Sequence, residues 1–347
     1  MQGTPGVRLV SGPNLQCPAM KLASYRDGSR DGQLVVVSRD LSMALYANGI
    51  ASRLQQVLDD WNFLSPQLQD LSQTLNHGKA RHAFPFEPAM CLAPLPRAPR
   101  WVRAAAYLGP LERALRSRGV EPPTRLKSQP LFHPSASDLF VGAAQDAVFR
   151  SADAEIDFEA QWAVVTADIA AGASPDQALE GVRLVGLLND WTLRATADAE
   201  LAQGGAWVHG KPPAGWAPVL VTLDELGGAW QRGRLALQVE IRHNGKHFAR
   251  LATGEGMQFH VGQLLATLAR QRPLTAGTLL SSGAIGQDDA AAGCASLMAQ
   301  RVGAADAKPA RPLPDYLKDG DEVQIEAIGA DGQSVFGAIA QTVVTRD

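Results

Sequence analysis

The sequence contains few cysteines and no long apolar run, and both absences narrow the class of protein. Its three cysteines, Cys17, Cys91 and Cys294, lie far apart without a CxxC pair. This pattern argues against a zinc finger or a disulfide scaffold and predicts a reduced, cytoplasmic protein. No apolar run approaches the roughly 20 residues that span a bilayer, and residues 1–19 lack the apolar core of a signal peptide. We therefore expect no membrane partner.

The chain also lacks an excess of basic residues and several familiar catalytic motifs. Its 32 lysines and arginines against 35 acidic residues give a formal net charge of −3, so we expect no nucleic acid partner. No G-x-G-x-x-G follows a predicted strand and opens a helix, and no H-E-x-x-H occurs. Ser281-Ser282-Gly283 is not a G-x-S-x-G elbow. Nucleotide binding, zinc-peptidase activity and serine-hydrolase activity therefore have no support.

The N-terminal part is predicted to be a hairpin followed by helices. Residues 1–19 are rich in Gly and Pro, and we expect them to be a poorly structured extension with Met20 as the natural first residue. A Gly-rich turn joins two strand-like stretches in residues 21–38. Residues 52–61 have apolar residues at helical spacing, and residues 65–78 predict a helix that begins at a Ser-Pro pair.

Proline-rich segments divide the chain. The stretch APLPRAPR at 93–100 is the first predicted boundary. It separates a hairpin-and-helix domain at 20–95 from a linker and helix at 96–137. That helix is predicted at 101–119, and a larger domain is predicted at 138–347.

The larger domain is predicted to consist mostly of strands. Residues 182–190 are a continuous apolar run that ends in Asn189-Asp190, which is typical of a buried strand with a polar end. Residues 260–271 predict an amphipathic helix. Further strands are predicted at 216–226, 234–246 and 275–284 and near the C-terminus. The predicted fold class is α+β, a β-rich mixed fold with helical decoration.

Residues 156–166, IDFEAQWAVVT, alternate apolar and polar side chains as a strand does. One face carries Ile156, Phe158, Ala160, Trp162 and Val164, and the other begins with Asp157, Glu159 and Gln161. The polar row is either a solvated or charged edge face or one wall of a polar site.

Other carboxylates could join this polar row. Asp190 ends the apolar run at 182–190, and Asp138 lies in a turn-like segment upstream. Carboxylates from separate strand ends repel each other unless a cation or shared protons neutralise them. Together they would form a hard oxygen site suited to Mg²⁺, Mn²⁺ or Ca²⁺. Spacing alone leaves open whether they meet.

Two basic residues and two histidines are further candidates. Arg194 follows Asp190 by four residues, and Lys211 lies in a loop stiffened by two prolines. Each is either ordinary surface charge or part of an anion site, where a guanidinium suits a carboxylate and an ammonium stabilises developing negative charge. His133 and His209 are candidate bases, although isolated loop histidines are more often solvated or hydrogen-bonded.

The order of several segments resembles the fumarylacetoacetate hydrolase family over roughly residues 130–345. In chain order they are DFEAQWAVV, LLNDWTLR, GKPPAGWAPVLVT, NGKHFARLATGEGMQFHVGQLLATLARQRPLTAGTLLSSGA and LKDGDEVQIEAIG. The resemblance implies a fumarylacetoacetase C-terminal-like mixed β-roll at 138–347 and a smaller N-terminal α+β domain. It also implies a homodimer, an oxo-acid substrate and a divalent cation in an all-oxygen cage.

The resemblance also implies roles for individual residues. The implied metal ligands are Asp138, Glu159, Asp190 and, as a neutral amide, Gln161. The cation would be Mg²⁺, with Mn²⁺ or Ca²⁺ as alternatives, and it would be weakly held. Lys211 would stabilise the enolate, Arg194 would face the substrate, and His133 would substitute for a missing base.

The sequence departs from the family pattern at four positions. Gln161 replaces the second glutamate of E-x-E, which removes a negative charge, so Gln161→Glu is expected to tighten metal binding. The other departures are Gln145 for a histidine, Ala284 for a threonine and Gln300 for a glutamate. Each removes a base, a hydroxyl or a charge.

Three functions remain open. The resemblance favours metal-dependent hydrolysis of a C–C bond in a β-diketo or acylpyruvate-type acid through a metal-stabilised enolate. Tautomerisation or decarboxylation of an oxo acid would need no activated water. The third alternative is a catalytically weakened paralogue that binds a metabolite.

Overall fold

The structure, a computed structural model, describes residues 19–150, 154–287 and 293–346. The expectation for residues 1–19, including Cys17, therefore falls almost wholly outside the described residues. Cys91 and Cys294 are buried free thiols. Within the described ranges, no helix is long and apolar enough to cross a membrane.

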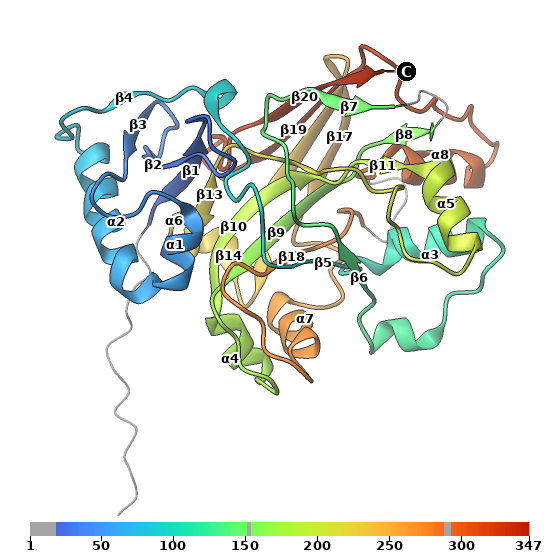
Figure 1. Cartoon of the computed structure of the whole chain (residues 1–347). Helices are drawn as coiled ribbons and strands as arrows, with labels where there is room; N and C mark the ends of the chain where they lie inside the picture. The colour runs from blue at the N-terminus through green and yellow to red at the C-terminus, as the bar shows by residue number, and fades with distance from the viewer. Residues whose placement is uncertain (1–18, 151–153, 288–292, 347) are drawn as a thin grey trace, which may run out of the picture.

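Eleven of the described strands form one mixed sheet in the order β4-β3-β2-β1-β13-β10-β9-β18-β5-β6, with β12 paired to β10. Its strands are β1 (Lys21–Tyr25), β2 (Gln33–Val37), β3 (Met43–Tyr46), β4 (Phe84–Pro85), β5 (Trp101–Ala104), β6 (Phe132–Ser135), β9 (Ala160–Thr166), β10 (Val182–Asn189), β12 (Gly215–Trp216), β13 (Leu220–Thr222) and β18 (Leu279–Ser281). Figure 1 shows the blue N-terminal strands at one side, followed by the long β10 and β9. The sheet therefore continues from the N-terminal hairpin into the larger domain.

Five other strands form a second sheet in the order β17-β16-β19-β20-β7. They are β7 (Ala147–Phe149), β16 (Gln238–His243), β17 (Lys246–Ala252), β19 (Glu322–Ile328) and β20 (Ile339–Thr345). Two short pairs complete the described strands, β8 (Ile156–Asp157) with β11 (Thr192–Leu193) and β14 (Trp230–Gln231) with β15 (Arg234–Leu235).

The α-helices lie around these sheets (Figure 1). They are α1 (Leu54–Asp59), α2 (Trp61–Asn76), α3 (Leu108–Ser117), α4 (Pro175–Glu180), α5 (Arg194–Ala202), α6 (Leu223–Leu226), α7 (Val261–Leu268) and α8 (Leu297–Asp306). Short 3₁₀ turns occur at Pro88–Met90, Thr124–Lys127 and Gly227–Ala229.

The large sheet is covered on both faces, as β9 illustrates. Every residue of β9 is buried. Trp162 and Val164 belong to a core shared with the five-stranded sheet, whereas Ala163 and Val165 belong to a second core shared with α1 and α2. Burial of each large apolar side chain contributes about 1.5–3 kcal/mol. The predicted alternation is therefore confirmed, but a solvated face is wrong, because Gln161 is also buried.

Three element predictions need correction. The strand predicted at 216–226 ends with β13 (Leu220–Thr222), and its last four residues form α6 (Leu223–Leu226). The helix predicted at 101–119 is instead the buried strand β5 followed by α3, because β18 and β6 pair with residues 101–104 on either side. The helix predicted to begin at the Ser-Pro pair begins at Trp61, so Pro66 lies inside it. The fold class is confirmed as a strand-rich α+β fold with open, mixed sheets.

Candidate active site

Polar side chains gather at one end of the β9–β10 pair. The antiparallel register places Ala160 of β9 opposite Asn189 of β10, so Gln161 and Asp190 lie at the same end. The Asp190 backbone N–H donates to the Glu159 carbonyl oxygen at 2.9 Å. The sheet pairing thus brings Glu159, Gln161 and Asp190 together although 28 residues separate Gln161 and Asp190 along the chain.

One oxygen of Asp190 accepts three hydrogen bonds. Arg103 Nη1 donates to Asp190 Oδ2 at 2.8 Å, Gln161 Nε2 at 2.9 Å and Lys211 Nζ at 3.0 Å. Asp190 is fully buried. A buried carboxylate needs such donors, because burial without compensation strongly disfavours its charged form.

Glu159 bridges Asp190 and a second ion pair. Its Oε2 accepts from Gln161 Nε2 at 3.0 Å and from Lys211 Nζ at 3.2 Å. Its Oε1 accepts from Arg194 Nη2 at 2.8 Å. Arg194 also donates through Nε to Asp157 Oδ2 at 2.8 Å. We call Asp157, Glu159, Asp190, Arg103, Arg194, Lys211 and Gln161 the charged cluster.

The charged cluster sets three carboxyl side chains, Asp157, Glu159 and Asp190, against three basic side chains, Arg103, Arg194 and Lys211. All six of these side chains are largely buried, and Glu159 is the most exposed at 13%. Burial alone would raise the pKa of Glu159, but Lys211, Arg194 and Arg103 lower that pKa to about 2. Burial lowers the pKa of Lys211, although Asp190 and Glu159 act against this. Shifted groups of this kind are typical of functional sites.

An aromatic side chain covers the cationic side of the charged cluster. The Trp207 ring lies 5.0 Å from Arg103 Cζ and 5.6 Å from Lys211 Nζ, both within cation–π range. Its ring centroid is 4.3 Å from that of His133. Burial, and then Arg103 and Lys211, lower the pKa of His133 to about 4. His133 is therefore neutral near pH 7.

The loop that carries Trp207 is tied to α5. Glu200 accepts backbone N–H bonds from Val208 at 3.0 Å, His209 at 2.7 Å and Gly210 at 3.1 Å. The His209 ring is 84% exposed and contacts Glu200, not the charged cluster. His209 is therefore placed outside the candidate site.

The predicted site residues do not all meet. Glu159, Gln161, Asp190, Lys211 and Arg194 lie in the charged cluster, and His133 lies beside it. Asp138 is exposed and forms no hydrogen bond or ion pair with another described residue. Its role as a ligand stays a prediction. Of the other departures, Gln145 accepts from the Gly142 backbone N–H at 3.0 Å, Ala284 packs against the core, and Gln300 lies on α8.

Sequence reasoning missed Arg103 and Trp207. Arg103 is nearly fully buried on β5, and its signal was a lone arginine in the otherwise apolar stretch WVRAAAY. Nothing in the sequence indicated that Trp207 belongs to the site, except that it is a tryptophan four residues before Lys211 in the same loop.

The donor set of the charged cluster does not fit a divalent cation. Gln161 turns its amide N–H₂ toward Glu159 Oε2 and Asp190 Oδ2; the reverse orientation would place a third oxygen against two carboxylates. Within the described residues, the buried side-chain oxygens here without a donor are Asp190 Oδ1 and Gln161 Oε1. Waters can supply several of the oxygen ligands of Mg²⁺, but the cation still needs one or two carboxylates, and here Arg103 and Lys211 already contact Asp190, while Lys211 and Arg194 contact Glu159. No group of three or more His, Cys, Asp or Glu is placed to hold a metal among the described residues.

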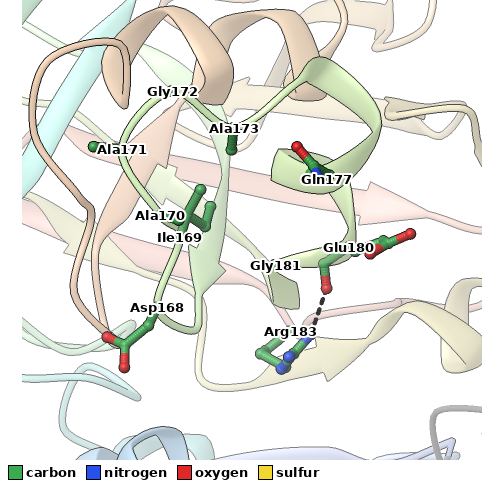
Figure 2. Close-up of a pocket in the computed structure, with 10 residues that line it drawn as sticks. All are labelled: Asp168, Ile169, Ala170, Ala171, Gly172, Ala173, Gln177, Glu180, Gly181 and Arg183. Carbon is green, nitrogen blue, oxygen red and sulfur yellow. Dashed lines mark hydrogen bonds between the residues drawn. The ribbon is translucent and has the colours of Figure 1, made fainter. Parts of the chain in front are cut away.

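A surface hollow lies at the opposite end of the β9–β10 pair (Figure 2). Its volume is about 540 Å³, and residues of the segment joining the two strands line it. Arg183 Nη1 donates to the Glu180 backbone oxygen at 2.7 Å, and Asp168 Oδ1 accepts from the Ala276 backbone N–H at 2.8 Å. Arg183, which lines the hollow, and Asp190 of the charged cluster are seven positions apart along the same stretch of chain, roughly 20 Å in a strand. The hollow and the charged cluster are therefore separate. We take the charged cluster as the candidate site, because it contains the buried charged side chains.

Two family models, both of fumarylacetoacetase-type domains, together match nearly all of the chain from residue 20 onward. Residues 20–97 match the fumarylacetoacetase N-terminal domain 2 model, and residues 101–344 match the fumarylacetoacetate (FAA) hydrolase C-terminal model. No curated protein matches significantly.

Solved structures share the fold at low sequence identity. Fumarylacetoacetate hydrolase from Exiguobacterium antarcticum has a TM-score of 0.65 and 19% identity, over 94% of this chain and 100% of that one. The 2-hydroxyhepta-2,4-diene-1,7-dioate isomerase from Mycobacterium marinum has a TM-score of 0.58 and 16% identity, over 94% and 98%. Fumarylpyruvate hydrolase from Pseudomonas aeruginosa, in complex with Mn²⁺ and pyruvate, has a TM-score of 0.51 and 16% identity, over 77% and 93%. The chain belongs to the fumarylacetoacetate hydrolase family, with a fold that hydrolases and an isomerase share.

Proposed function

We propose that this chain enolises an oxo acid at the charged cluster and acts as an isomerase that needs no divalent cation. The observation that carries the proposal is the state of Asp190. Its Oδ2 is held by three donors, whereas its Oδ1 is buried and has no donor within the described residues. Every oxygen of Asp157 and Glu159 accepts at least one hydrogen bond. Asp190 Oδ1 is therefore the carboxylate oxygen of the charged cluster without a donor among the described residues, and we assign it the role of proton acceptor.

In the proposed step, a C–H bond next to the substrate carbonyl breaks. The proton moves to Asp190 Oδ1, and the electron pair moves into the carbonyl to give an enolate oxygen. Lys211 and Arg103 lie on the other oxygen of Asp190 and supply fixed positive charge that stabilises this enolate. The proton then returns to a different atom of the substrate. The product is an isomer of the substrate, and no other reactant is consumed.

Hydrolytic C–C cleavage is the second candidate, since members with this fold include hydrolases. It requires a second base that activates water, in addition to the groups that form and stabilise the enolate. The candidate for this base is His133, whose ring contacts Trp207 and lies beside the charged cluster. Isomerisation needs only the proton transfer at Asp190 Oδ1 and no activated water, so it is the first candidate.

One experiment separates the candidates. The protein is incubated in D₂O with chelator and acetylpyruvate, and proton NMR follows deuterium exchange next to the carbonyl and release of pyruvate. Isomerase-type enolisation predicts exchange above the buffer rate without pyruvate, lost in Asp190→Asn. Pyruvate release would instead support hydrolysis. Saturable binding without either would support a metabolite-binding paralogue, and exchange that requires added Mg²⁺ or Mn²⁺ would contradict the proposal.

A further inference from the structure

Arg103 is built into the large sheet and is not a surface side chain. It lies on β5, opposite His133 of β6 and Ser281 of β18. Its side chain is 4% exposed. The guanidinium carbon lies 5.4 Å from the Trp101 ring and 5.0 Å from the Trp207 ring. A buried guanidinium in such a position is a fixed charge.

The guanidinium of Arg103 uses only part of its donor capacity. Nη1 donates to Asp190 Oδ2, whereas Nε and Nη2 are buried without a partner among the described residues. We call the edge formed by Nε–H and Nη2–H the side-on edge. The indole Nε1 of Trp207, which lies over the same guanidinium, is also buried without a partner in the described part of the chain.

Other arginines of this chain show what a filled side-on edge holds. Arg194 places Nε and Nη2 on Asp157 Oδ2, at 2.8 and 2.7 Å. Arg97 places the same two atoms on the two oxygens of Asp31, at 2.8 and 2.6 Å. In both cases the group held is a carboxylate, and planar recognition of carboxylates is what this geometry favours.

We infer that Arg103 stands in place of a divalent cation, neutralising Asp190 through Nη1 and binding the substrate carboxylate through its side-on edge. This inference rests on the proposed function, because it names the part of the oxo acid that the site recognises. A divalent cation would neutralise the carboxylates and hold the oxo-acid oxygens; the guanidinium supplies both contacts from one side chain. The ligand class is a small 2-oxo acid with a free carboxylate.

Pyruvate is the probe for this site, and methyl pyruvate is its neutral counterpart. With chelator present, calorimetric titration should show pyruvate binding, with methyl pyruvate weaker by at least about 10-fold. Arg103→Lys keeps the charge but loses the planar edge and should weaken pyruvate binding about 10-fold; Arg103→Met should weaken it about 100-fold. Arg97→Met is the matched control, and it should leave binding unchanged.

Two outcomes overturn the inference: equal binding of pyruvate and methyl pyruvate, or unchanged pyruvate binding in folded Arg103→Lys. The exchange assay keeps the two proposals distinct. Arg103-dependent pyruvate binding without exchange would retain the inference and reject the proposed function. Exchange at the wild-type rate in Arg103→Lys would retain the proposed function and reject the inference.

Metal binding provides an independent test of the inference that Arg103 stands in place of a divalent cation. The double variant with Arg103→Ala and Gln161→Glu removes the internal cation and restores a carboxylate. It should bind Mn²⁺ in a calorimetric or EPR titration, whereas the wild type should not bind at millimolar Mn²⁺. The matched variant with Arg97→Ala and Gln161→Glu keeps Arg103 and should stay without Mn²⁺. Absence of Mn²⁺ binding in the folded Arg103 double variant, or binding by the wild type, would overturn the replacement.

Discussion

The two sides of the charged cluster contain the same kinds of residue but differ in how their donors are used. On one side, Arg194 directs Nε and Nη2 at Asp157, which also accepts the backbone N–H groups of Leu297 and Met298. On the other side, Arg103 gives one N–H group to Asp190 and keeps its side-on edge unpartnered among the described residues. The comparison shows that the donors of Arg194 are used within the fold, whereas Arg103 keeps donors that our inference assigns to a ligand.

The largest expected effect is on the Arg194 side. Arg194→Met would leave the fully buried Asp157 without its cation, and removal of one partner of a buried pair costs about 3–5 kcal/mol. Chemical denaturation would measure this loss of unfolding free energy. Arg97→Met, which breaks an exposed pair, should lose far less unfolding free energy than Arg194→Met. Equal losses in the two variants would contradict a structural role for the Arg194 side.

Gln161→Glu should have the next largest effect, because it places a third carboxylate within hydrogen-bond distance of Glu159 and Asp190. We expect a loss of about 1–3 kcal/mol of unfolding free energy at pH 7. The new carboxyl has a raised pKa in the folded state, so the loss should shrink as pH falls toward 5. Gln177→Glu, at an exposed position of α4, is the control and should change stability little. A pH-independent loss would count against like-charge repulsion.

A smaller effect concerns the pH dependence of stability through His133. Its pKa is lowered from 6.5 to about 4 in the folded protein. Between pH 6.5 and 4 the unfolded chain gains a proton that the folded chain does not, so unfolding free energy falls as pH falls through this window. After allowance for partial exposure, the contribution is at most about 2 kcal/mol. His133→Gln should flatten this part of the stability curve, and an unchanged slope would contradict a neutral, half-buried ring.

The smallest effect is expected at the cover of the Arg103 side. Trp207→Phe keeps an aromatic ring over Arg103 and Lys211 but removes the unpartnered Nε1 donor. Stability should change by no more than about 0.5 kcal/mol, while pyruvate binding should weaken about 3–10-fold. Trp230→Phe, on β14 and outside the charged cluster, is a control for the general loss of an indole. If the wild type, Trp207→Phe and Trp230→Phe bind pyruvate with equal affinity, Trp207 is not part of the ligand site.

Local patterns predicted much of the fold but only part of the site. The alternation in residues 156–166 correctly separated the apolar face from Asp157, Glu159 and Gln161, because period 2 is a property of the strand itself. Arg103 was missed because its stretch, rich in alanine, favours a helix locally. Its strand is fixed by partners distant in sequence, β6 and β18. The resemblance indicated that Glu159 and Asp190 meet beside Lys211. It did not indicate that Arg103 pairs with Asp190, since Arg103 lies on β5, outside the segments that carry the resemblance.

The pairing of β1 with β13 has a consequence for the integrity of the protein. Lys21 and Leu22 pair with Val221 and Leu220, and the Met20 backbone N–H donates to Thr222 Oγ1 at 3.0 Å. The two family models meet near residue 100, yet the backbone hydrogen bonds run across that boundary. Expression of residues 101–347 alone would expose β13 as an unprotected edge strand, which invites aggregation. The two parts should therefore unfold in a single cooperative transition and should not behave as separable modules.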